Sequence, residues 1–357
     1  MSLNTQILEK IRRVEPYVPG EQPKGKVVKL NTNENPYPPS PAVAEALNAL
    51  NADSLRLYPD PACQPLVAEL AKTYGVEEDQ VFVGVGSDDV ISMSFLTFFH
   101  SDKPILFPDI SYSFYKVWAQ LYRIPYETPS LDENFRIRRE DYYRENGGII
   151  FPNPNAPTAI WEDMDFIEDI LQHNPDVVVI VDEAYVDFAG ENASALKLLK
   201  KYDNLLIVQT FSKSRSLAGM RIGFAIGNPE LIRYLNDAKY SFNSYTMSRP
   251  ALACGVAALR DTDFFKKTIQ NIVDTREWAA EEFKKLGFEM TESSANFLFV
   301  RHPEYDGGEL FDMLKQKQIY VRHWDSERIS QYLRVTVGTR EEMEILLSSL
   351  REYMTQK

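Results

Sequence analysis

The chain has 357 residues, of which 44% are hydrophobic and 25% are charged, and its net charge is −13. A chain of this length predicts about two domains and can bury a large core without disulfides or metals. The acidic balance argues against nucleic acid and anionic membranes as partners, because both bind basic surfaces.

The cysteines and the N-terminus indicate the compartment. Cys63 and Cys254 belong to no pairing motif, which is typical of a reducing environment. The N-terminal MSLNTQILEKIRRVEPY is polar, and no run of about 18 apolar residues occurs in the chain. We therefore expect a cytoplasmic protein that does not span a membrane.

The first two thirds of the chain follow an α/β pattern. Residues 15–41 are rich in Pro, Asn and Gly, which predicts an extended arm, and a helix is expected near 42–50. Short apolar runs then alternate with amphipathic stretches. The expected strands are 81–85, 104–108, 147–154, 176–185, 205–211 and 221–227, and the expected helices are 88–99, 112–122 and 161–173. This alternation predicts a mainly parallel central sheet.

The pattern changes beyond residue 260. A long helical region covers about 263–286, and shorter strands and helices follow it, which predicts a smaller α+β domain. Thr339 and Glu342 have the spacing of a capping box that begins the last helix. We therefore expect an N-terminal arm (1–40) that packs with the small domain, a large domain (41–260) and a small C-terminal domain (261–357).

The segment TFSKSRSLAGMRIGF (210–224) carries the first candidate functional group. Lys213 follows a predicted buried strand, and a lysine at such a strand end can form a Schiff base with an aldehyde cofactor. Thr210, Ser212 and Arg221 could bind a phosphate. By itself, however, a lysine in such a loop is more often a solvated surface residue.

A second candidate group lies in VVVIVDEAYVDF (177–188). Asp182 follows five apolar residues, so it is expected at the carboxyl end of a core strand, where open α/β sheets bind ligands. A carboxylate there can keep a pyridine nitrogen protonated, and Tyr185 could bond a ring hydroxyl. A helix-capping Asp182 and a core Tyr185 are the alternatives.

Two further segments resemble ligand-binding turns. VGVGSDDVI (83–91) reads as strand, turn and helix start, and backbone N–H groups at a helix start bind phosphate. Its third glycine for a dinucleotide fingerprint is missing, which disfavours a Rossmann site. FPNPNAPTA (151–159) predicts a rigid turn that presents asparagine side chains, although such a turn also has purely structural roles.

Together and in this order, the four segments resemble the fold-type I aminotransferases, which use pyridoxal 5′-phosphate (PLP), across essentially the whole chain. The resemblance implies an α/β fold-type I PLP-dependent transferase, in which Lys213 carries the coenzyme and moves the proton. It also implies that Asp182 bonds the pyridine nitrogen and that Tyr185 bonds the ring oxygen. The further coenzyme contacts implied are Ser87, Asp88 through its backbone, Tyr112 by ring stacking, Thr210, Ser212 and Arg221.

The resemblance also implies a homodimer. Tyr58, in YPDP, matches the tyrosine that the partner subunit contributes to the coenzyme phosphate, and the N-terminal arm would pack on that partner.

One position departs from the family. The usual turn Asn-Pro-Asn-Asn-Pro-Thr-Gly here has Ala156 in place of the second asparagine of its pair, which normally contacts the ring oxygen. Asn155 is the substitute that the sequence suggests.

Near the N-terminus the chain has PYVPGEQP followed by LNTNENPYPPSP (30–41), and near the C-terminus it has YVRHW followed by YLRVTVGTREE (332–342). These segments resemble the two ends of histidinol-phosphate aminotransferases. Arg334 would then bind the α-carboxylate of glutamate, and Arg322 and Tyr17 would bind the phosphate of histidinol phosphate. Arginine binds either anion bidentately, although surface salt bridging is the alternative for both arginines. The implied reaction exchanges the amino group between glutamate and imidazole-acetol phosphate and yields 2-oxoglutarate and histidinol phosphate for histidine biosynthesis.

Several other functions compete with this interpretation. An aromatic amino-acid aminotransferase is the nearest, and a threonine-phosphate decarboxylase is more distant. A PLP-binding regulator would carry a DNA-binding module, which neither the roughly 30 residues before the family arm nor the acidic net charge of the chain fits. An inactive scaffold would be expected to lack Lys213, Asp182 or Arg221. The four scattered histidines predict no metal site, and no G-x-S-x-G elbow suggests a hydrolase.

Overall fold

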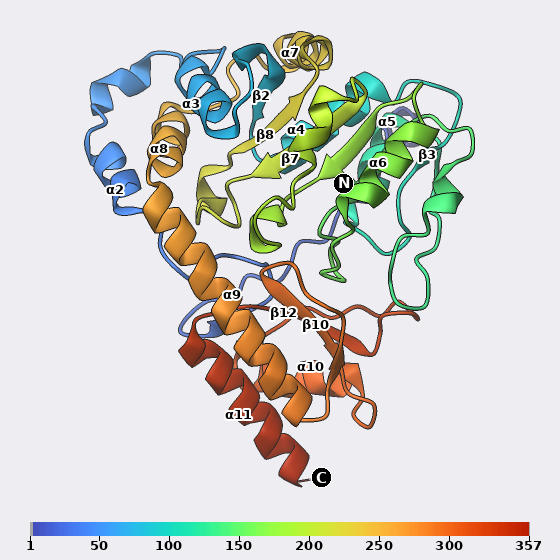
Figure 1. The fold of residues 1–357 in the computed structure, drawn as a ribbon, viewed down its shortest axis with the longest axis vertical. Coiled ribbons are helices and arrows are strands. Elements are labelled where there is room, and N and C mark those ends of the chain that lie inside the picture. Colours follow the sequence, from blue (N-terminus) through green and yellow to red (C-terminus); the bar gives the residue numbers. More distant parts are fainter. Residues whose placement is uncertain (1–2, 357) are drawn as a thin grey trace.

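A seven-stranded sheet forms the centre of the larger part of the molecule (Figure 1). The computed structural model describes residues 3–356. The strands follow the order β2-β8-β7-β6-β5-β3-β4, and the four pairs from β7 to β4 are parallel, whereas β8 runs antiparallel to both of its neighbours. The strands are β2 (Val81–Gly84), β3 (Ile105–Leu106), β4 (Tyr126–Glu127), β5 (Ile149–Pro152), β6 (Val179–Asp182), β7 (Leu205–Thr210) and β8 (Gly223–Gly227). The predicted mainly parallel α/β sheet is therefore confirmed.

Helices cover both faces of this sheet because its strands are apolar on both faces. In β6, Ile180 packs with residues of α4, α5 and α7, whereas Val179 and Val181 point to the opposite face, towards α6. At the β2 and β8 end of that second face, α3 and α8 pack on the strands. These helices are α3 (Gln64–Tyr74), α4 (Ser87–Phe98), α5 (Phe114–Tyr122), α6 (Met164–His173), α7 (Pro229–Phe242) and α8 (Arg249–Arg260), and α2 (Pro41–Asn48) packs on α8.

The C-terminal part is smaller and is built on an antiparallel sheet of order β12-β10-β9. Its strands are β9 (Glu289–Met290), β10 (Phe297–Arg301) and β12 (Tyr332–Thr336), and its helices are α9 (Thr262–Lys285), α10 (Gly307–Gln316) and α11 (Arg340–Gln356). The long α9 runs down from the large sheet and lies beside α11 (Figure 1). The predicted capping box is present, because the Thr339 N–H donates to Glu342 at 2.8 Å and the Glu342 N–H donates to Thr339 Oγ1 at 3.2 Å.

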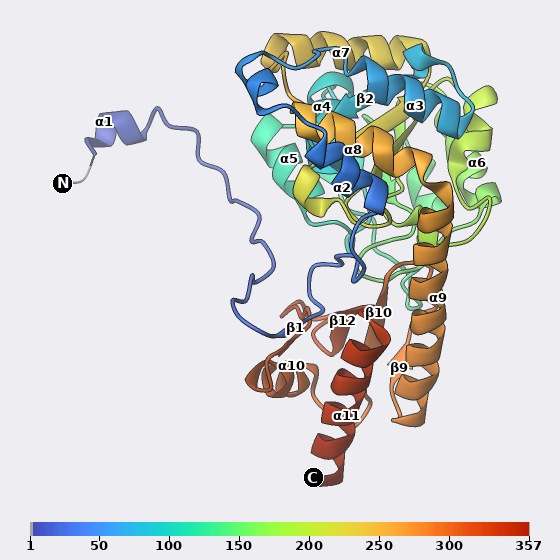
Figure 2. The same ribbon diagram turned by 90° about the vertical axis from the view of Figure 1, so that its left-hand side faces the viewer.

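The N-terminal arm joins the smaller part by strand pairing. β1 (Val28–Lys29) pairs in parallel with β11 (Ile319–Tyr320). Further towards the N-terminus, the arm contacts α5 through Tyr17 and Arg12, and α1 (Thr5–Leu8) lies apart from the other helices (Figure 2). Its apolar side chains Leu3, Ile7, Ile11, Val14 and Val18 are all exposed. No helix within residues 3–356 has the length and apolar character needed to cross a bilayer.

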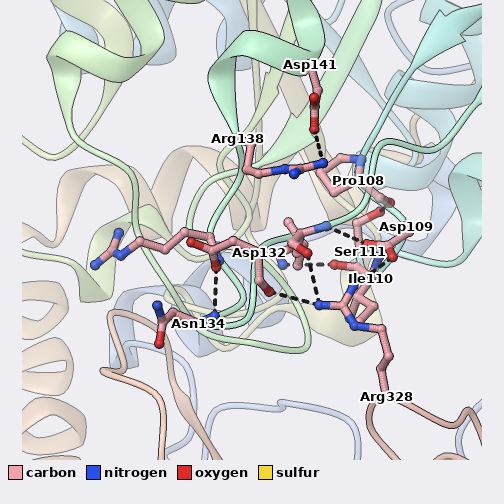
Figure 3. A network of polar contacts seen from close by, with 12 residues as sticks. Pro108, Asp109, Ile110, Ser111, Asp132, Asn134, Arg138, Asp141 and Arg328 are labelled. Carbon is pink, nitrogen blue, oxygen red and sulfur yellow. Dashed lines mark hydrogen bonds and ion pairs between the residues drawn. The ribbon is translucent and has the colours of Figure 1, made fainter.

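A polar network fixes the C-terminal part to the large one beside the site described below (Figure 3). The Arg328 guanidinium donates to Asp109 Oδ2 at 2.9 Å and to the carbonyls of Leu131 and Asp132 at 3.0 and 2.9 Å. The other oxygen of Asp109 accepts the Leu131 N–H at 2.9 Å. The loop that follows β3 is thereby held in place just before Tyr112.

Candidate active site

Two adjoining cavities, of about 180 and 650 Å³, lie between the large sheet and the C-terminal part. The carboxyl ends of β5, β6 and β7 border the smaller cavity through Pro152, Asp182 and Thr210, as expected for a ligand site of an open α/β sheet. Most of the expected site residues line it, namely Ser87, Asp88, Tyr112, Asp182, Tyr185, Thr210, Ser212, Lys213 and Arg221. Tyr17, Arg322 and Arg334 line the larger cavity, whereas Asn155 and Tyr58 line neither.

Lys213 lies at the junction of the two cavities and lines both. Its ammonium donates to the Thr32 carbonyl at 3.0 Å and forms no ion pair with the carboxylates of residues 3–356. Burial and the nearby Arg334 lower its pKa to about 8, although Asp88 and Glu34 oppose the shift. A lysine with such a pKa can act as a nucleophile and a proton carrier, in contrast to a solvated surface lysine.

Asp182 ends β6 and is almost fully buried. Its Oδ2 accepts the Tyr115 hydroxyl at 2.7 Å, and its Oδ1 accepts the Ala184 N–H at 3.2 Å. Burial raises its pKa to about 6 in spite of these two hydrogen bonds. A cationic ring nitrogen in the cavity would offset this cost of burial.

The N-terminus of α4 and Arg221 form a cradle suited to a phosphate. Gly86 precedes α4 with a φ of +83°, and a Cβ there would lie 2.6 Å from the Arg221 guanidinium. A Cβ on Gly223 would lie 2.3 Å from the Ser87 nitrogen, so β8 and the helix start touch directly. The first N–H groups of a helix have no intrahelical partner and attract anions.

The Asp88 side chain connects this cradle to the aromatic wall of the cavity. It accepts the Tyr112 hydroxyl at 2.7 Å and the Arg221 guanidinium at 3.3 Å. Burial and the adjacent Asp88 carboxylate raise the pKa of Tyr112 well above its usual range, so the hydroxyl stays protonated as the donor. The sequence had suggested only a backbone role for Asp88.

Asn155 does not face the cavities and has no donor left for a ligand. Its amide donates to the Ile110 carbonyl and to Thr158 Oγ1, both at 3.0 Å, and its buried Oδ1 has no partner within the described residues. The neighbouring Ala156 does line both cavities. An anionic ring oxygen needs a hydrogen-bond donor, so this geometry does not favour Asn155 as the substitute.

Arg322 and Arg334 meet across a β-bridge, and each backbone N–H donates to the other's carbonyl at 3.0 and 2.9 Å. Arg334 donates to the Asn31 carbonyl at 2.7 Å, its Nε is buried without a partner among residues 3–356, and burial lowers its pKa. No carboxylate in that range lies within salt-bridge distance of either arginine, so their charges are available to an anion. Tyr17, stacked on Phe114 with centroids 4.3 Å apart, faces the same cavity.

The family model for class I and II aminotransferases matches residues 25–350. The chain belongs to this aminotransferase family. It is 51% identical over 345 residues to the histidinol-phosphate aminotransferase of Clostridium beijerinckii and 53% identical over 343 residues to histidinol-phosphate aminotransferase 1 of Methylococcus capsulatus. The alignments cover 96% of this chain and 96% of each relative.

Solved structures give the same fold. The histidinol-phosphate aminotransferase of Clostridium acetobutylicum superimposes with a TM-score of 0.85 at 22% identity. The superposition covers 92% of this aminotransferase and 99% of that structure. That of Sinorhizobium meliloti, solved in complex with PLP, gives a TM-score of 0.83 at 23% identity and covers 92% and 91%. The expected fold-type I architecture is confirmed.

The enzymes of this family are PLP-dependent, and the residues of this aminotransferase fit the coenzyme. The cradle at Gly86 and Arg221 suits its phosphate, Asp182 suits its ring nitrogen, and Lys213 suits its aldehyde. When bound, PLP supplies that aldehyde and a ring that accepts an electron pair.

The sequence missed two residues that touch this site. Tyr115 lies on α5 and follows Tyr112, which precedes that helix, by three positions; in the expected helix 112–122 this spacing predicts one shared face and could have indicated Tyr115. Asn33 donates to the Tyr185 hydroxyl at 3.0 Å from 152 positions away, and no local pattern could have predicted that contact.

Proposed function

We propose that this aminotransferase transfers the amino group of glutamate to imidazole-acetol phosphate, giving 2-oxoglutarate and histidinol phosphate on the route to histidine. Two neighbouring arginines, Arg322 and Arg334, support the proposal most strongly. Both line the cavity that Lys213 also lines, and neither forms a salt bridge within residues 3–356. Glutamate ends in a carboxylate and histidinol phosphate in a phosphate ester, and an arginine fork binds either anion. Relatives of about 50% identity over nearly the full chain carry this name.

The residues of the chain divide the work between binding and proton transfer. Arg334 orients the substrate carboxylate, and Arg322 with Tyr17 holds the phosphate of the second substrate. The Lys213 amine carries a proton between the substrate Cα and the coenzyme carbon, and its pKa of about 8 keeps part of this amine neutral near pH 7. Asp182 keeps the ring nitrogen protonated, and Tyr185 donates to the ring oxygen.

Comparative kinetics test the substrate. Steady-state kcat/KM values would be measured for histidinol phosphate, phenylalanine and threonine phosphate with the same preparation. We expect histidinol phosphate to lead phenylalanine by at least about 100-fold, because phenylalanine has no phosphate and would leave Arg322 and Tyr17 without their anion. A lead of phenylalanine by orders of magnitude would overturn the substrate assignment. Tyr17 and Trp324, which line the larger cavity, favour the aromatic alternative as the second candidate.

The role of Lys213 has its own test. Lys213→Ala should reduce turnover by at least about 10²–10⁴-fold, because it removes the covalent anchor and the proton carrier. Circular dichroism would verify that the variant keeps its fold, and mass spectrometry after borohydride reduction would locate the coenzyme in the wild type. Retained transamination by Lys213→Ala would refute the assignment.

We also infer that the enzyme is a homodimer in which Tyr58 reaches the coenzyme phosphate of the partner subunit. Tyr58 is 76% exposed and stacks on Tyr245 with centroids 4.5 Å apart. Leu57, the neighbour of Tyr58 in sequence, and Phe242, near Tyr245, are also exposed, so an apolar surface is available for a second copy. A cytoplasmic location accords with two free, buried cysteines and with biosynthetic relatives.

A further inference from the structure

With Ala156 in the aminotransferase turn, the ring oxygen of bound PLP would lack one donor that this turn usually supplies. Ala156 stands at that position, and both amide hydrogens of Asn155 are used within the protein. Tyr185 is the remaining side chain that the sequence places there, and it lines both cavities. Its value as a donor depends on where its hydroxyl proton points.

Asn33 determines that direction. It is fully buried and left-handed, with a φ of +55°, a conformation that asparagine tolerates better than most residues. Thr336 Oγ1 accepts the Asn33 backbone N–H at 3.0 Å and donates its own proton to Asn33 Oδ1 at 3.0 Å. This reciprocal pair fixes the amide so that Nδ2 points to the Tyr185 hydroxyl, 3.0 Å away.

The Tyr185 oxygen therefore accepts a hydrogen bond from Asn33, and its proton remains available to the cavity. We propose that Asn33 is a positioning residue that makes Tyr185 a dedicated donor to the ring oxygen of PLP and so compensates for Ala156. The inference rests on the proposed binding of PLP at Lys213.

The support for Tyr185 comes from the C-terminal part of the chain. Thr336 ends β12, and Asn296 Nδ2 donates to the Asn33 carbonyl at 3.1 Å. Phe297, the first residue of β10, packs edge-on against the Tyr185 ring with centroids 5.0 Å apart and an interplanar angle of 83°. The small sheet and the arm thus fix the orientation of the Tyr185 hydroxyl, although Tyr185 belongs to the large part.

Asn33→Asp is the discriminating variant. It keeps the size, the tolerance of a left-handed backbone and the oxygen facing Thr336, but it replaces the amide donor by an acceptor. The Tyr185 proton should then turn to the introduced carboxylate and away from the ring oxygen. Asn33→Gly, which adopts the same φ without strain, removes the contact without adding charge.

The measurement is the pH midpoint of the coenzyme absorbance in substrate-free enzyme, together with the dissociation constant of PLP. Tyr185→Phe should raise the midpoint by about one pH unit, because the anionic ring oxygen loses a stabilising donor. Asn33→Asp and Asn33→Gly should each raise it by a comparable amount. In the Tyr185→Phe background, Asn33→Gly should add no further shift, and Asn33→Asp should add less than it does when Tyr185 is present.

The double-mutant cycle separates positioning from simple charge or folding effects. Equal shifts in both backgrounds would show that Asn33 acts independently of Tyr185 and would overturn the inference, as would an unchanged midpoint in both Asn33 variants. Wild-type protein without a coenzyme absorbance or a reduced adduct at Lys213 would refute the proposed function itself. A wild type with a titrating coenzyme and insensitive Asn33 variants would refute only this inference.

Discussion

Asp182 is a carboxylate whose burial should leave a signature in stability as well as in catalysis. Burial raises its pKa from 3.8 to about 6, so the folded protein keeps a proton that the unfolded chain has already released. Its contribution to stability is therefore complete below about pH 4 and is lost as the pH rises through 6. Asp182→Asn has no such titration.

We therefore predict that, without coenzyme, Asp182→Asn gains stability relative to the wild type between pH 4 and 6, by up to about 3 kcal/mol. Urea unfolding of both proteins at several pH values measures the difference. Bound PLP should reduce it, because the protonated ring nitrogen pairs with the ionised Asp182. A difference that is independent of pH in the coenzyme-free proteins would contradict the prediction.

Arg334 and Arg322 should differ in the half-reactions that they serve. Arg334→Lys keeps the charge but loses the planar fork, and we expect kcat/KM for glutamate to fall by about 10²-fold. Single-turnover absorbance changes with glutamate and with histidinol phosphate would measure each half-reaction separately. Arg322→Lys is the matched control: it should affect histidinol phosphate more than glutamate. Equal losses for both substrates in both variants would contradict the division of roles.

At the scale of single residues, the sequence identified the site residues that lie within short sequence motifs. Lys213, Asp182 and Arg221 lie at or near strand ends, and the structure brings all three to one cavity. The contacts that orient them were not predictable, because they join distant positions. Asn33 meets Thr336 across 303 positions, a pairing that depends on how the arm folds onto the small sheet.

At the scale of elements, the approach of β8 to the start of α4 forms the phosphate cradle. Gly223→Ala would place a Cβ 2.2 Å from the Gly86 carbonyl carbon, and backbone atoms on both sides cannot yield without moving the helix. We expect affinity for PLP to fall at least about tenfold, as one charge-assisted hydrogen bond is worth roughly 1.5–3 kcal/mol.

Equilibrium titration of coenzyme-free protein with PLP tests this effect. Gly219→Ala, in the turn that leads into β8, is a matched control, because a Cβ there meets nothing within 4 Å. It should leave the affinity unchanged. Wild-type affinity in a folded Gly223→Ala protein would show that the close approach does not shape the phosphate site.

The elements themselves were largely predictable from apolar periodicity, as β6, β7 and α9 illustrate. The antiparallel direction of β8 was not predictable, since an apolar run has no direction and only the connection through Lys213 and Arg221 determines it. The helices α3, α7 and α8 were not predicted. The amphipathic stripe of α7, for example, includes Ile232 and Leu235 but also the buried Lys239, which interrupts the apolar pattern.

At the scale of the whole molecule, the strand pairing of the arm and the polar network around Arg328 join parts that are far apart in the sequence. Composition and periodicity predicted a large and a small part but not these contacts. The arm also exposes several apolar side chains that nothing else in residues 3–356 covers. Together with Tyr58 and Phe242, they favour the proposed dimer over a monomer.

Phe242 offers a direct test of that dimer, because its side chain is 76% exposed and its loss should not disturb the fold of one subunit. Phe242→Glu places a charge on the apolar surface, and we expect a monomer by light scattering at micromolar concentration. PLP should then bind about tenfold more weakly, since Tyr58 of the partner subunit no longer reaches the phosphate. A folded dimer with unchanged PLP affinity would contradict both expectations.

A mixing experiment separates the shared site from simple destabilisation. Tyr58→Phe subunits keep Lys213, and Lys213→Ala subunits keep Tyr58, so a mixed dimer contains one complete site. Mixing the two inactive or weakened proteins should therefore restore PLP affinity and turnover at half of the sites in each mixed dimer. If each site used only its own chain, mixing would yield no more than the sum of the separate activities, and the exchange of Tyr58 between subunits would be ruled out.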